Sequence, residues 1–323
     1  MIIAAVLAAA LALLAPQLLK SYGVFLLSYW LVYLIATMGL NLIVGYAGQK
    51  ALGQAAFLGI GAYTTAIMLK AGFSFWLALP ASAGLCFALG LVVGFPALRV
   101  QMVYLAFATI GFNEVVVLVM RNEEWLTGGT FGISNIQRPS VLGVSLEGNV
   151  AYYYLLLACA LGISLLLWGI VRSPWGKAFT ALRDNSIRAE SLGVNIQRYT
   201  LLAFAIGSAF AGVAGALFAP LVGFIEPSPF SAQISIMMYL MVVIGGPGYL
   251  LGPVVGAAIG VLAPEALRFA EGWYLVIFGA LVIALMVWLP GGLLSIPDLL
   301  RDRRLTRAES AARSAVAREG AAA

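Results

Sequence analysis

The chain has 323 residues, of which 63% are hydrophobic and 10% are charged, and its mean hydropathy is +1.01. Soluble domains carry about 25% charged residues, so this composition excludes an ordinary soluble domain and indicates an integral membrane protein. The net charge of +5 fits positively charged cytoplasmic loops better than a nucleic-acid partner.

Catalytic and metal-binding residue types are sparse. The sequence contains no histidine, which argues against zinc or triad chemistry. Its two cysteines, Cys86 and Cys159, lie inside apolar runs and are expected to be buried thiols. We therefore expect no catalytic residue, no metal site and no cofactor.

Apolar segments recur along the chain. They approach the roughly 20 residues of a membrane-spanning helix, which favours helices over the short alternating strands of a barrel. The segments cover residues 1–19, 24–44, 52–69, 75–98, 101–120, 150–171, 199–225, 231–244, 248–263 and 272–290. Segments 231–244 and 248–263 are short and are expected to be half-helices or one re-entrant pair. The predicted fold is an all-α polytopic bundle of about 8–10 transmembrane helices with broken or re-entrant segments.

The distribution of positive charge predicts the orientation. Even numbers of apolar segments flank a basic stretch at 172–198, which places that stretch and both termini in the cytoplasm. Segment 1–19 has no basic residue before its apolar core, so a retained span is favoured over a cleaved signal peptide. Residues 1–297 are assigned to one transmembrane domain, and the Arg- and Ala-rich residues 298–323 to a cytoplasmic tail.

The segment Gly39–Gly61 is rich in glycines and amides. One interpretation is a broken helix, because irregular backbone at membrane depth is tolerated beside protein or a water-filled cavity, where transporters place substrate sites. The alternative is a tight turn near residues 46–50 followed by close-packed small residues. Under the first interpretation, the predicted substrate path includes Asn41, Gly45, Gly48, Gln49, Gly53 and Gln54.

Glu114 lies inside the apolar segment 101–120. A carboxylate at the centre of a spanning helix costs about 2.5–3.5 kcal/mol, so a deep Glu114 should face a cavity or a polar partner. The alternative is an interfacial position, from which the side chain snorkels. The outer loop that follows contains a glycine turn or, alternatively, is an ordinary connection. Glu114 and the loop residues Thr127, Gly128 and Gly129 complete the predicted substrate path.

The basic stretch 172–198 is predicted to contain a helix over residues 173–193. Ser173 can cap its start, Pro174 fits the first helical position, and Gly193 provides the stop. The stretch has five cations and two anions, namely Arg172, Lys177, Arg183, Arg188, Arg198, Asp184 and Glu190. A folded cytoplasmic helix between spans suggests a docking surface for a soluble partner.

Small residues dominate the second half of the chain. The stretch Gly245–Gly260 is interrupted by Pro247 and Pro253, so two broken segments in opposite halves suggest an internally repeated transporter fold. Small residues also recur every fourth position from Gly207 to Ala219, which lets helices approach closely, within the chain or in a dimer. The sequence has no phosphate-binding loop with its Lys and hydroxyl, so any ATP must bind another chain.

These residues together resemble the LivM-type permease subunits of branched-chain amino acid ABC transporters. The resemblance covers about residues 38–295. Its motifs are Gly45–Tyr63, Tyr104–Glu114, Thr127–Ile133, Ser173–Ala178, Ala181–Asn185, Gly193–Asn195, Ala203–Ala205 and Ala211–Leu217.

The resemblance implies an ABC importer permease in a bacterial inner membrane. Its partners would be a second, LivH-like permease, two cytoplasmic ATPase subunits, a periplasmic or lipid-anchored substrate-binding protein and membrane lipid, with no nucleic acid. It also implies that segment 173–193 couples to the ATPases, where Ile187, Arg188 and, elsewhere, Lys50 depart from the family pattern. The coupling residues it implies are Gly176, Ala181, Arg183, Asp184, Asn185, Ala189 and Gly193.

Two further hypotheses remain open at this stage. The first keeps the class of protein but changes the cargo to urea, short amides or another small polar nutrient of the kind that close relatives carry. An ATP-independent channel or carrier is a different class, and it would not need the folded basic loop. A membrane enzyme is disfavoured because the apolar segments lack clustered acids and histidine.

Overall fold

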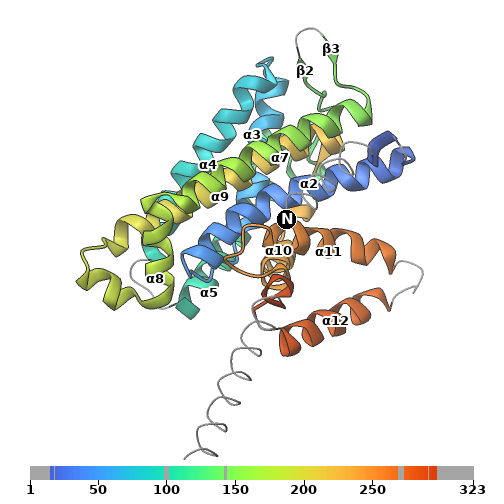
Figure 1. The fold of residues 1–323 in the computed structure, drawn as a ribbon. Coiled ribbons are helices and arrows are strands. Elements are labelled where there is room, and N and C mark those ends of the chain that lie inside the picture. Colours follow the sequence, from blue (N-terminus) through green and yellow to red (C-terminus); the bar gives the residue numbers. More distant parts are fainter. Residues whose placement is uncertain are drawn as a thin grey trace, which may run out of the picture.

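The computed structural model describes residues 15–17, 19–97, 102–141, 144–267, 273–289 and 291–296. Most of the predicted first span and the whole predicted tail, residues 298–323, lie outside these ranges. The described chain is a helical bundle (Figure 1), as the sequence predicts, and its strands are only two residues long.

The first half of the chain contains most of the long helices. They are α2 (Ser21–Asn41), continued by the π-helical η1 (Leu42–Tyr46), then α3 (Gln54–Lys70), α4 (Phe75–Ala97), α5 (Met102–Asn122) and α7 (Asn149–Arg172). Between α5 and α7 lie α6 (Glu124–Thr127), η2 (Gly129–Phe131), β1 (Ile133–Ser134), β2 (Ser140–Val141) and β3 (Val144–Ser145).

The second half begins with α8 (Pro174–Ser191), the helix of the basic stretch. It continues with α9 (Ile196–Val222), β4 (Phe224–Ile225), η3 (Ser228–Phe230), α10 (Ala232–Gly245), α11 (Gly252–Ala266), α12 (Tyr274–Trp288) and η5 (Leu293–Ser295). Within the described residues, five helical segments are long and apolar enough to cross a membrane: 21–46, 75–95, 104–122, 149–172 and 196–222. As expected, α10 and α11 are shorter, and they pack against each other and against α2.

The core is built around α9, which packs against α2, α3 and α4. Helix α9 presents the predicted row of small residues to these neighbours. A Cβ added at Gly207 would meet the carbonyl oxygen of Gly39, and one added at Gly215 would meet the carbonyl oxygen of Leu58. The row therefore serves helix packing within this chain, which is one of the two roles that the sequence leaves open.

The bundle has two distinct ends, which we call the sheet end and the α8 end (Figure 1). At the sheet end, β1 pairs antiparallel with β4, with Ile133 opposite Ile225. Helices α2 and α7 begin side by side at this end. The side chain of Asn149, the first residue of α7, donates to the hydroxyl of Ser21, the first residue of α2, over 2.8 Å. At the other end, α8 packs against α7, α9 and η1.

Two broken segments run in opposite directions through the bundle. Helix α2 ends at the α8 end, the chain turns back through residues 47–53, and α3 then starts beside the middle of α2. Helix α9 instead ends at the sheet end, and α10 starts beside the first turn of α3 and leads to the α8 end. This antiparallel pair is the arrangement expected of an inverted transporter repeat.

Candidate functional site

The first turns of helices α3 and α10 meet α5 in the middle of the bundle. The backbone N–H of Leu52 donates to the Thr109 hydroxyl, and the N–H of Ala55 donates to the Ser235 hydroxyl, each over 2.9 Å. The Ser235 hydroxyl in turn donates to Asn113 Oδ1 over 2.9 Å. We call this set the mid-bundle junction; its residues are Leu52, Ala55, Thr109, Asn113 and Ser235.

The junction is buried and its polar groups are paired. Asn113 is 0% exposed, and its Nδ2 donates to the carbonyl of Phe230, just before α10 begins, over 3.0 Å. Gln54, at the start of α3, is 2% exposed and donates to the carbonyl oxygens of Ala36 and Gly207 over 3.0 and 3.1 Å. Gln54 therefore joins α3 to both α2 and α9, and the N–H groups of Leu52 and Ala55 already have protein partners.

Glu114 follows Asn113 but projects from a different face of α5, about 100° around the helix axis. That face is exposed and otherwise apolar, with Tyr104, Phe107, Val115 and Leu118 between 55% and 67% exposed. Glu114 lies 12 residues after the start of α5 at Met102 and at the level of the junction. The deep position of Glu114 in the membrane stays a prediction.

A second cluster lies at the α8 end, where the two glycine-rich stretches touch. Asn41 Nδ2 donates to the carbonyl of Tyr249, and Asn41 Oδ1 accepts from the N–H of Gly248, both over 2.9 Å. Arg183, from α8, donates through Nη1 to the carbonyl of Gly45 over 2.8 Å. The structure thus brings the predicted path residues Asn41, Gly45 and Gly48 together with the predicted coupling residue Arg183.

Glycine is required at the closest approaches in this cluster. A Cβ on Gly45 would collide with Asn41 Oδ1 and with the N–H of Gly248. Gly48 has a φ of +70°, and its Cα lies against the stem of Arg183. Gln49 lies beside it and donates weakly to the carbonyl of Ala47, over 3.4 Å. The predicted helix break and the predicted tight turn are therefore successive parts of one segment, which turns at residues 46–50 and then re-enters the bundle.

Gly53 lies at the junction, where an added Cβ would be 2.8 Å from the Thr109 carbonyl oxygen, and the predicted path residues of the outer loop lie at the sheet end. The Thr127 hydroxyl donates to the carbonyl of Met120 over 2.8 Å and accepts from the N–H of Gly129 over 3.2 Å. Gly128 and Gly129 have φ values of +77° and +62°, so the loop needs glycine at both positions. The predicted path residues are thus distributed over the sheet end, the junction with the exposed face of α5, and the α8 end.

Helix α8 begins as the sequence predicts, with the Ser173 hydroxyl accepting from the N–H of Trp175 over 3.2 Å. The prediction of one continuous helix is wrong, however, because Asn185 has φ −163° and ψ +103°. The Asn185 side chain accepts from the N–H of Arg188 over 3.0 Å and so caps a second, short helical piece. Gly193 ends this piece with a φ of +85°.

The predicted coupling residues divide into buried and exposed groups. Gly176 and Ala189 are buried and Ala181 is half-buried, whereas Arg183, Asp184, Asn185 and Gly193 are exposed. Among their large apolar side chains, α8 and its C-terminal cap expose Ile187 and Leu192 most, at 78% and 83%. From the sequence, Ile187 is identified only as a departure from the family pattern and not as a contact residue. Its isolation among polar neighbours was the signal for an exposed contact residue.

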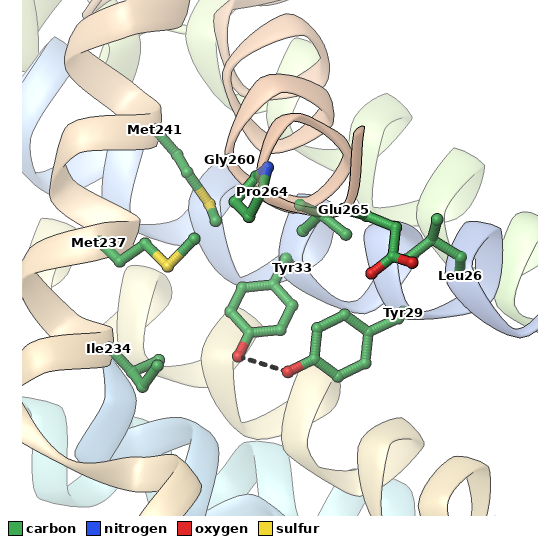
Figure 2. A pocket seen from close by; sticks show the side chains of 10 residues that line it. Leu26, Tyr29, Tyr33, Ile234, Met237, Met241, Gly260, Pro264 and Glu265 are labelled. Carbon is green, nitrogen blue, oxygen red and sulfur yellow. Dashed lines mark hydrogen bonds between the residues drawn. The ribbon is translucent and has the colours of Figure 1, made fainter. Parts of the chain in front are cut away.

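A cavity of about 450 Å³ lies apart from the junction, between α2, α10 and α11. Figure 2 shows Tyr29 and Tyr33 from α2, whose hydroxyls share a hydrogen bond of 3.1 Å, facing Met237 from α10. Glu265 of α11 lines the same cavity. None of the predicted path residues contributes to its lining.

Comparison with known proteins places this geometry in a family. The family described as "Branched-chain amino acid transport system / permease component" matches residues 22–287. The high-affinity branched-chain amino acid transport system permease protein LivM of Escherichia coli (strain K12) is 34% identical, over 87% of this chain and 72% of the relative. LivM of Salmonella typhimurium is also 34% identical, over 86% of this chain and 71% of the relative.

More distant relatives share a smaller part. The autoinducer 2 import system permease protein LsrC of Salmonella typhi is 29% identical, over 62% of this chain and 57% of the relative. No solved structure matches the chain. The match across residues 22–287 includes the junction, the α8 end and the sheet end, and the chain therefore belongs to the permease-component family of branched-chain amino acid transport systems.

Proposed function

We propose that this chain is a multi-pass subunit of the bacterial inner membrane that imports branched-chain amino acids at the expense of ATP. It would pair with a second, LivH-like permease, bind two cytoplasmic ATPase subunits and receive its substrate from a periplasmic or lipid-anchored binding protein. Family membership and the substrate in the names of the LivM relatives support this proposal. Both chain termini and α8 would lie in the cytoplasm.

The observation that carries the proposal is the construction of α8. This helix stands at one end of the bundle, bonds to the α2–α3 break through Arg183, and exposes Ile187 and Leu192. Isolated apolar side chains that project among charged neighbours are suited to pockets on a protein partner. A channel or carrier without ATPases has no need for such a surface.

The substrate path is proposed to run along the exposed face of α5. Placing the Glu114 carboxylate against lipid at mid-helix would cost about 2.5–3.5 kcal/mol. We therefore expect Glu114 to face a second subunit or a water-filled path instead of lipid. Its neighbours on this face, Phe107, Val115 and Leu118, are apolar and exposed. A carboxylate among apolar side chains complements an amino acid that carries an ammonium group and a branched aliphatic side chain.

The proposed cycle follows from these positions. Binding of ATP closes the ATPase subunits, and their movement reaches the bundle through α8. The two broken segments then change their positions relative to α5, which exchanges an outward opening for an inward one, and ATP hydrolysis resets the arrangement. The paired amides of the α3 N-terminus argue that the substrate carboxylate meets other groups than the N–H of Leu52 and Ala55.

Uptake by a strain that lacks this permease tests the cargo. Restoring the gene should restore uptake of labelled leucine, with isoleucine and valine competing and urea having no effect. Competition by urea without competition by isoleucine or valine would instead assign a small polar nutrient. Transport by the purified chain alone in liposomes, without nucleotide, would refute the ATP-driven class altogether.

Substitution of the exposed apolar side chains tests the docking surface. Ile187→Asp and Leu192→Asp should each reduce co-purification of the ATPase subunits and leucine uptake about fivefold or more, as expected if each is one of the minority of contact residues that cost above about 1 kcal/mol when changed. Gln197→Asp is the matched control, because it adds the same charge at an exposed position of the first turn of α9. Equal ATPase recovery from all three variants would show that α8 is not the docking surface.

A further inference from the structure

Arg183 occupies a position that docking alone does not explain. Its side chain is 40% exposed and donates through Nε to the adjacent Asp184 carboxylate over 3.3 Å, while Nη1 reaches between the two glycine-rich turns, Gly45–Gly48 and Gly245–Tyr249. It donates to the carbonyl of Gly45 over 2.8 Å, and Nη1 also lies against Gly248, where an added Cβ would collide with it. One side chain of the basic helix therefore touches both broken segments of the bundle.

The electrostatics of the two helix ends favour a cation at this point. Gly45 belongs to η1, the last turn of the α2 helix, and α10 ends at Gly245, just before Gly248. The last carbonyl groups of a helix carry a partial negative charge and lack partners within the helix. A guanidinium at this site satisfies a terminal carbonyl with a charge-assisted bond and lies close to the end of a second helix.

The steric fit makes the contact a rigid one. Gly48 lies so close to Arg183 that a Cβ there would be 2.9 Å from its Cγ and 3.0 Å from its Cα. Asn41 separately ties the two turns together through its bonds to Gly248 and Tyr249. The two turns are therefore held to each other by Asn41 and to α8 by Arg183.

The kink at Asn185 divides α8 into an inner part before it and an outer part after it. Arg183 precedes the non-helical residue Asn185, whereas the exposed Ile187 and Leu192 follow it. The bundle-facing contact and the solvent-facing apolar side chains thus lie on different sides of one fixed bend. The Asn185 side chain caps the outer part through its bond to the N–H of Arg188, and the backbone at Asn185 joins the outer part to the inner one.

We propose that Arg183 is a positioning residue that transmits movement of α8 to both broken segments at once, by clamping the Gly45–Gly48 turn against the Gly245–Tyr249 turn. This inference rests on the proposed function. It predicts that loss of the clamp uncouples ATP hydrolysis from transport and leaves the ATPase subunits bound, because the Nη1 bond to Gly45 is made with the bundle and the exposed apolar side chains Ile187 and Leu192 are unchanged.

The test uses the complete transporter, reconstituted in liposomes with its binding protein, and compares Arg183→Gln and Arg183→Lys with the wild type. Arg198→Gln is the matched control, because it removes the same charge from an exposed site in the first turn of α9. The measured quantities are ATPase subunits bound per permease, ATP hydrolysed and leucine imported. Leucine imported per ATP should fall at least about tenfold in Arg183→Gln, since hydrogen bonds to charged groups are among the stronger ones.

Each outcome decides the proposal. Normal ATPase binding with a low ratio of leucine to ATP in Arg183→Gln, an intermediate ratio in Arg183→Lys and an unchanged ratio in Arg198→Gln would support the clamp. An unchanged ratio in Arg183→Gln would overturn it, and so would loss of ATPase binding, which would make Arg183 a docking residue. If Arg183→Gln fails to insert, Arg183→Lys decides alone, because it keeps the charge and stem but loses the planar fork. Failure of the wild type to couple transport to ATP would instead refute the proposed function.

Discussion

Asn113 and Glu114 are adjacent in sequence, yet they lie on different faces of α5 and have different surroundings. Asn113 is buried and ties the starts of α3 and α10 to α5, whereas Glu114 is exposed on an apolar surface. The helical period turns successive side chains about 100° apart, which lets one helix hold the bundle on one side and offer a carboxylate on another. Position on the helix therefore matters more here than residue type.

Glu114→Gln is the residue-scale test of the substrate path. The neutral amide keeps the shape of the side chain but removes the attraction for an ammonium group, so KM for leucine uptake should rise about tenfold, as expected for a loss of about 1.4 kcal/mol. The amount of the permease in the membrane should be unchanged, because a neutral side chain is easier to insert. Glu147→Gln, in the exposed outer loop, is the control, and equal KM values for both variants would remove Glu114 from the path.

Much of the residue-scale arrangement could not be predicted from the sequence. The glycine content of Gly39–Gly61 indicates the break that the structure has between Tyr46 and Gln54, and the cap at Ser173 is predictable because its signals are local. The bonds between Asn41 and Tyr249 and between Ala55 and Ser235 join positions about two hundred residues apart, and no local pattern specifies them. The kink at Asn185 was missed because asparagine also occurs inside helices, and its capping role depends on the backbone conformation.

At the scale of elements, the packing of α9 against α3 depends on backbone-to-backbone contact. Such contact needs residues without a side chain at the crossing points, and it compensates for the absence of a hydrophobic driving force between helices in lipid. Gly61 faces the backbone of Gly212, and Gly215 faces the backbone of Leu58 and Ala62. The spacing of small residues predicted close packing, but only the three-dimensional structure identifies the neighbouring helix.

Gly215→Ala should therefore destabilise the bundle. The added Cβ would collide with the Leu58 carbonyl and lie 2.7 Å from the N of Ala62, and backbone atoms cannot yield as a side chain can. Overpacking of this kind costs about 1–3 kcal/mol, which lowers the thermal unfolding midpoint of the purified protein in detergent.

Gly162→Ala in α7 is the matched control for this substitution. An added Cβ there has no described neighbour within 4 Å, and alanine favours a helix over glycine by about 0.5–1 kcal/mol. Its unfolding midpoint should equal or exceed that of the wild type. A Gly215→Ala midpoint as high as that of Gly162→Ala would contradict the close approach of α9 to α3.

For the molecule as a whole, the two broken segments run antiparallel. The α2–α3 segment turns back from the α8 end and the α9–α10 segment turns back from the sheet end, so each half places one turn at a different end. Both half-helices start at the junction on α5. A movement that opens one end can therefore close the other, provided that the two ends lie on opposite sides of the membrane.

Cysteine labelling in cells tests that arrangement directly. Phe131→Cys at the sheet end and Leu192→Cys just beyond α8 place thiols at positions where the native side chains are 87% and 83% exposed. The native Cys86 and Cys159 would first be replaced by alanine, so that each protein carries one thiol. A membrane-impermeant maleimide should label the cysteine at 131 in intact cells and the cysteine at 192 only after the inner membrane is opened. Both cysteines should react in detergent, which confirms that the thiols are accessible. Labelling of both positions in intact cells would place the two ends on one side, and the bundle could then neither cross the membrane as proposed nor receive a push from cytoplasmic ATPases at α8.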